Sequence, residues 1–72
     1  MVSGVKERLA DVLMSVSWRE IARSYFGKSS SWLYHKLDGI DSLGGFTQEE
    51  AQQLRLALVD LSDRIKVAAE RI

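Results

Sequence analysis

The side chains of this sequence that could bind a ligand are concentrated between positions 19 and 36. The candidates are Arg19, Arg23, Lys28, Ser29, Ser30, Ser31, Tyr34, His35 and Lys36. Arginine and lysine bind phosphate groups, whereas hydroxyl, imidazole and phenol groups contact the edges of bases or stack on them. These residue types are therefore suited to non-covalent binding of duplex DNA, with the basic groups and Ser29 on phosphates and the others on bases.

The same stretch offers little for catalysis or metal binding. Residues 27–29, Gly-Lys-Ser, are similar to the end of a phosphate-binding loop, but that motif needs a glycine where this chain has Ala22. His35 is the one histidine of a chain without cysteine, and Asp38 and Asp41 lack the spacing of a calcium loop. No motif places a histidine base beside the serines. We therefore expect a non-enzyme with no cofactor, no metal ion and no small-molecule substrate.

The charge of the chain is balanced overall but unevenly distributed. The 72 residues include ten basic and ten acidic side chains, which argues against strong nonspecific binding to nucleic acid. Residues 18–37 nevertheless carry a net charge of +3, whereas residues 38–63 carry −5. The basic segment thus coincides with the candidate binding residues.

Helices are expected to position these residues, because apolar side chains recur at helical spacing along the chain. A first helix is predicted over residues 5–15. A second begins after Ser17, which can form a capping box with Glu20. Gly27 suits the left-handed position that ends such a helix.

A third helix is predicted to follow at once. Ser29 or Ser30 can cap its first turn, and Leu33 and Leu37 fall on its inner face. The second and third helices together predict a helix-turn-helix over about residues 17–38. A glycine-containing loop, residues 40–46, should connect it to the last helix.

The last predicted helix, about residues 47–71, begins with a second capping box between Thr47 and Glu50. Its apolar residues are spaced alternately by three and four, a heptad pattern typical of coiled coils. We predict a homodimer through the later part of this seam, namely Leu58, Leu61, Ile65, Ala68 and Ile72. The same spacing also fits a helix that packs on its own domain, and both alternatives remain open at this point.

These features predict one small all-α domain over residues 1–72. It should have four helices, a helix-turn-helix and a long C-terminal amphipathic helix. Hydrophobic residues make up 46% of the chain, which is sufficient for a packed core. No apolar run is long enough to span a membrane, and the charged N-terminus does not match a signal peptide, so we expect a cytoplasmic protein.

The stretch IARSYFGKSSSWLYHKLDG resembles the helix-turn-helix of phage-repressor-like regulators, and FTQEEAQQLRLAL resembles the helix that follows it in that family. More narrowly, the motif IARxYFGKSxSWLYxKL is similar to a family of short uncharacterised bacterial proteins from gut anaerobes. The repressor resemblance implies that the third helix lies in the major groove with Ser30, Ser31, Tyr34 and His35 facing the bases.

Two positions depart from the repressor pattern. The interval from Ala22 to Gly27 is one residue longer than in those repressors, and Lys28 stands where they usually have an apolar residue. Two hypotheses follow. The first is a transcriptional regulator that binds double-stranded DNA as a dimer. The second is a helical adaptor that associates through its last helix without nucleic acid. The basic segment favours the first and the zero net charge favours the second; we prefer the first.

Overall fold

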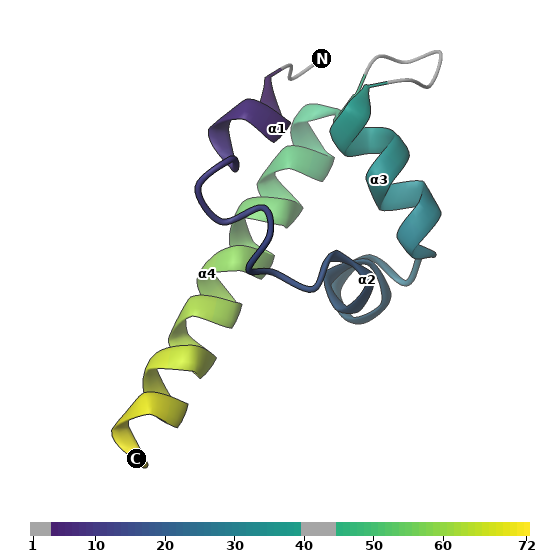
Figure 1. The fold of residues 1–72 in the computed structure, drawn as a ribbon. Coiled ribbons are helices and arrows are strands. Elements are labelled where there is room, and N and C mark those ends of the chain that lie inside the picture. The colour runs from purple at the N-terminus through teal and green to yellow at the C-terminus, as the bar shows by residue number, and fades with distance from the viewer. Residues whose placement is uncertain (1–3, 40–44) are drawn as a thin grey trace.

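The computed structural model describes residues 4–39 and 45–72, which form four α-helices and one π-helical turn (Figure 1). The elements are α1 (Val5–Arg8), α2 (Trp18–Ile21), η1 (Ala22–Phe26), α3 (Ser30–Asp38) and α4 (Gln48–Glu70). These ranges contain no β-strand, so the predicted all-α class is confirmed. Asp41 and most of the predicted loop before Phe46 lie outside the described residues.

The core lies where α2, η1, α3 and the first half of α4 converge. Its buried apolar residues are Trp18, Ile21, Ala22, Leu33, Leu37, Phe46, Leu54 and Ala57. Leu33 and Leu37 thus form the inner face of α3, as the helical spacing predicted. Ser31, Tyr34 and His35 of the same helix are exposed.

The first helix is much shorter than predicted. Instead of continuing to residue 15, α1 ends at Arg8 and the chain proceeds through tight turns. In these turns the Val12 N–H donates to Leu9 O, three residues back. The Trp18 indole N–H donates to the Leu13 carbonyl at 2.8 Å, which ties these turns to the buried Trp18. Poor helix formers in residues 12–17, where valine and serine recur, favour the same outcome.

The predicted capping box at the start of α2 is half formed. The Ser17 hydroxyl accepts a hydrogen bond from the Glu20 backbone N–H at 3.4 Å, as expected. The Glu20 carboxylate does not reach back to Ser17, because it accepts a 2.6 Å hydrogen bond from the Ser24 hydroxyl instead. The second predicted box is complete: Thr47 and Glu50 cap α4 reciprocally.

The extra residue between Ala22 and Gly27 is accommodated by the π-helical turn η1. A π-helical turn contains one more residue than an α-helical turn. The Gly27 N–H accordingly donates to the Ala22 carbonyl, five residues back, and Gly27 has the left-handed φ of 64° that was expected of it. The longer interval therefore changes the last turn of this helix while the glycine still ends it.

The last helix is longer than the core that it packs against. Its first half carries the buried residues Leu54 and Ala57, whereas the second half extends away from the other helices (Figure 1). The molecule is consequently elongated, with extents of 44 × 23 × 20 Å. None of the helices in the described ranges has the length and apolarity needed to cross a membrane.

Candidate nucleic-acid interface

Five of the nine predicted DNA-binding residues line one depression at the start of α3. This basic hollow has a volume of about 300 Å³ and is lined by Arg19, Arg23, Lys28, Ser29 and Ser30. Three cationic side chains, from α2, from η1 and from the turn before α3, therefore converge at one place, and none of the lining residues is acidic. A phosphate group could be held there by charge and hydrogen bonds.

Each wall of the basic hollow is positioned by a local feature of the backbone. Arg19 in α2 and Arg23 in η1 are four residues apart and so lie on the same side of the helix. Lys28 follows the left-handed Gly27, which turns the chain toward α3. The Ser29 hydroxyl caps α3 by accepting from the Trp32 N–H at 3.2 Å. Of the two serines predicted as possible caps of α3, the structure therefore uses Ser29.

The cations of the hollow are only weakly engaged within the protein. Arg23 lies 3.8 Å from the carboxylate of Glu20, and both side chains are largely exposed. A hydrogen bond from Ser24, together with the charge of Arg23, lowers the pKa of Glu20, so this carboxyl group stays ionised. The Lys28 ammonium lies over the ring of Trp32, 5.9 Å from its centre. Exposed ion pairs and cation–π contacts of this kind contribute little, so a phosphate could compete for these groups.

The outward face of α3 carries the residues predicted to meet base edges. Ser31 and His35 are exposed, and Tyr34 is 46% exposed. Ser31 and His35 lie on the part of α3 that faces away from Leu33 and Leu37, and Tyr34 lies at its edge. Ser30 was expected to face the bases with them, but it precedes the two leucines by three and seven residues, so it lies on their side of the helix and is half-buried. The structure thus places hydroxyl, phenol and imidazole groups beside the basic hollow.

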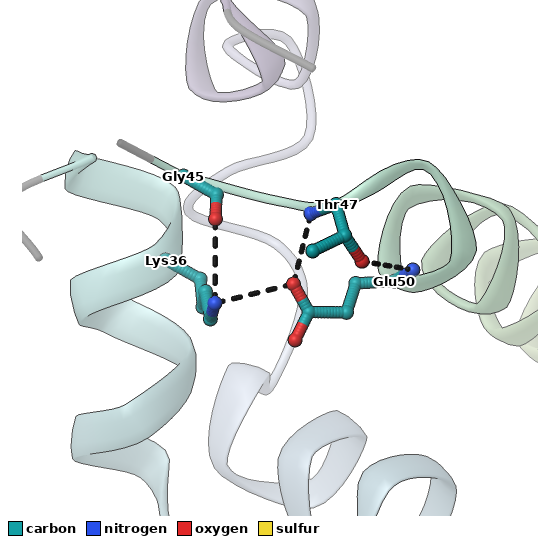
Figure 2. A network of polar contacts seen from close by, with 4 residues as sticks. All are labelled: Lys36, Gly45, Thr47 and Glu50. Carbon is teal, nitrogen blue, oxygen red and sulfur yellow. Dashed lines mark hydrogen bonds and ion pairs between the residues drawn. The ribbon is translucent and has the colours of Figure 1, made fainter. Parts of the chain in front are cut away.

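Lys36 is the one predicted DNA contact that the structure places elsewhere. Its side chain is only 7% exposed, and its ammonium points inward to Glu50 at 3.2 Å and to the Gly45 carbonyl at 3.4 Å (Figure 2). The ammonium also lies 5.7 Å from the centre of the Trp32 ring. The expectation that Lys36 holds a phosphate is therefore wrong for this conformation. The sequence contained a sign of this burial, because residues three apart on a helix lie on the same side and Leu33 faces the core.

The carboxylate that pairs with Lys36 also caps α4. Glu50 Oε1 accepts from the Thr47 N–H at 2.9 Å, and the Glu50 N–H donates to the Thr47 hydroxyl at 3.1 Å (Figure 2). Partial burial alone would raise the pKa of Glu50, but the Thr47 N–H and the Lys36 ammonium outweigh it and hold that pKa below its usual value. This network joins α3 to the start of α4.

A second set of polar contacts joins η1 to the middle of α4, and the sequence did not reveal it. Gln53 donates to the Tyr25 backbone carbonyl at 2.7 Å. The Tyr25 hydroxyl donates to Asp60 and accepts from Arg64 at 3.2 Å. The Tyr25 side chain is half-buried, and its hydroxyl reaches the surface of α4.

The five residues of the predicted dimer seam differ in exposure along α4. Leu58 and Leu61 are half-buried against the core, whereas Ile65, Ala68 and Ile72 are exposed. Leu58 and Leu61 thus pack on their own domain, which was one of the two alternatives, while Ile65, Ala68 and Ile72 lie outside the core cluster. The predicted homodimer stays a prediction. Among the described residues, no cluster of three or more histidine or acidic side chains could hold a metal ion.

Comparison with known proteins shows the family of the chain. No curated protein matches it, and neither does any solved structure. A family model described as "Domain of unknown function (DUF5053)" matches residues 5–72, which include every residue of the basic hollow and of the predicted dimer seam. This all-α chain therefore belongs to the DUF5053 family of domains of unknown function.

Proposed function

We propose that this protein binds duplex DNA through the basic hollow and the outward face of α3, and that it acts in the cytoplasm as a small, non-catalytic transcriptional regulator. The observation that carries the proposal is the convergence of Arg19, Arg23 and Lys28 on one depression at the start of an exposed helix. Two copies would act together, because one copy offers few phosphate contacts.

The arrangement supports this role in two steps. Phosphates would occupy the basic hollow, where the serines at the start of α3 add hydrogen bonds to the charge of the three cations. Ser31, Tyr34 and His35 would then lie against base edges. None of these three makes the paired hydrogen bonds with which arginine or asparagine reads a base, so each copy should discriminate weakly between sequences.

The test is a titration of a labelled mixed-sequence duplex by fluorescence anisotropy at low and moderate salt. We expect binding that weakens with salt. Replacing Arg23 and Lys28 with glutamine should reduce the slope of log K against log [salt] by roughly 2 per bound copy, since each phosphate contact contributes roughly 0.9.

A matched control removes the same charge elsewhere. Arg55 and Lys66 are exposed on α4, and neither lines the basic hollow. Their replacement by glutamine should change the slope much less. Equal losses in the two double variants would show that binding follows net charge alone and would overturn the proposed interface.

The second candidate function is an adaptor that assembles without nucleic acid. It is favoured by the exposed apolar residues Ile65 and Val67 on the second half of α4 and Ile72 just beyond its end. A protein that forms dimers but shows no binding to the duplex even at low salt would support this candidate instead.

A further inference from the structure

The second half of α4 carries apolar residues that the core of the same chain leaves uncovered. Exposure rises along the heptad seam toward the C-terminus: Leu54 is 3% exposed, Leu58 and Leu61 are half-buried, and Ile65 is 59% exposed. Ile72, two residues after the end of α4, is fully exposed. The heptad spacing continues without interruption through this change. The apolar seam of α4 is therefore longer than the part of the core that covers it.

The boundary between the covered and uncovered parts is a shallow apolar hollow. It has a volume of about 290 Å³ and is lined by Val12, Val16, Leu58, Leu61, Ser62 and Ile65. Val12 and Val16 cover the seam on one side there, and the side toward Ile65 is open. A partner helix that followed the seam would enclose this hollow.

We propose that the seam from Leu61 to Ile72 pairs with the same seam of a second copy as a parallel, in-register, two-stranded coiled coil. In heptad notation Leu61 and Ala68 occupy d positions, while Ile65 and Ile72 occupy a positions. Isoleucine at a with leucine at d favours parallel two-stranded pairing. The inference rests on the dimer in the proposed function and adds its orientation and register.

The charges beside the seam select the parallel arrangement. The g positions here are Arg64 and Arg71, and the e positions are Ser62 and Ala69. In a parallel pair g faces e of the second copy, so Arg64 lies against the small, neutral Ala69 and can cover it with its aliphatic part. In an antiparallel pair g faces g, which sets arginine against arginine, and like charges across an interface repel.

The first test measures assembly by sedimentation velocity over a range of protein concentrations. We expect a monomer–dimer equilibrium that Ile65→Asp weakens by roughly 100-fold or more, because two isoleucines per dimer lose their burial. Leu56→Asp is the matched control: Leu56 is 60% exposed on the same helix but lies at an f position, away from the seam. A monomeric parent, or equal effects of the two substitutions, would overturn the proposal.

The second test measures orientation and uses the absence of cysteine from the chain. Ala68→Cys places a single thiol at a d position, where a parallel in-register pair brings the two copies of residue 68 together. Mild oxidation should then crosslink the dimer rapidly. A dimer that sediments as expected but whose Ala68→Cys variant does not crosslink would exclude the parallel register. Both tests are made without DNA, so they can succeed or fail independently of the DNA titration.

Discussion

At the scale of single residues, Lys36 stands out because a charged side chain is buried there. It is the one buried charged residue among those the structure describes, and it is held by Glu50, the Gly45 carbonyl and the ring of Trp32. Removing one partner of a buried ion pair is costly, because the other charge remains where water cannot fully solvate it. Lys36 therefore holds α3 against the start of α4 and is not available to bind a ligand.

Replacing Lys36 with methionine should lower the free energy of unfolding by about 2 kcal/mol. This loss of stability is smaller than is usual for a broken buried ion pair, because the Glu50 side chain is 24% exposed and water can partly solvate its charge. Urea denaturation followed by circular dichroism measures the change. Adding Glu50→Gln to this variant should restore part of the loss, since glutamine can still cap α4 without a charge. A double variant less stable than the single one would contradict the account.

At the scale of elements, the π-helical turn η1 and Gly27 decide how α2 leads into α3. The extra residue of η1 rotates the end of this helix, and the left-handed Gly27 then lets the chain reverse toward the Ser29 cap. Lys28 is carried by this turn to the rim of the basic hollow. The geometry of the hollow thus depends on a backbone conformation that most side chains disfavour.

Replacing Gly27 with alanine should lower the free energy of unfolding by roughly 1–2 kcal/mol. The cause would be the backbone, since a Cβ at this position meets no atom within 4 Å but the φ of 64° is strained for an L-residue. Gly27→Asn is the informative companion, because asparagine tolerates this conformation better and should cost less. Thermal and urea unfolding measure both variants; equal losses would point to a steric cause.

At the scale of the whole molecule, α4 serves two purposes along its length. Its first half closes the core and receives polar contacts from Tyr25 and Lys36. In its second half the contacts end early, with the hydrogen bond from Arg64 to Tyr25 and the position of Ile65 at the edge of the apolar hollow, and residues 66–70 are all exposed. A helix segment without packing is only marginally stable in water. Its protection should therefore come from the second copy.

Hydrogen exchange should distinguish the two halves of α4, because the exchange rate of only the second half should depend on protein concentration. Amides of residues 63–70 should exchange rapidly at low protein concentration and become protected as dimers form. Amides of residues 51–57 belong to the core and should change little over the same range. Mass spectrometry of peptides from the two halves of α4 gives both values. Protection of residues 63–70 that is independent of concentration would show that this half is stable without a partner.

The sequence by itself determined the features that depend on local spacing and backbone chemistry. Helical periodicity and caps located α3 and α4, the inner face formed by Leu33 and Leu37, and the glycine that ends the helix after α2, because each depends on residues within a few positions of one another. The basic segment that lines the hollow was visible for the same reason. The sequence also contained the full heptad seam of α4.

Contacts between distant residues decided the rest. Lys36 turns inward to meet Glu50 on α4, and α1 ends at Arg8, after which tight turns lead the chain to the buried Trp18. The tertiary structure also divided the heptad seam into a buried half and an exposed half, a distinction that spacing cannot make because both halves follow the same period. Periodicity shows which side of a helix is apolar, whereas only the packed chain shows what covers that side.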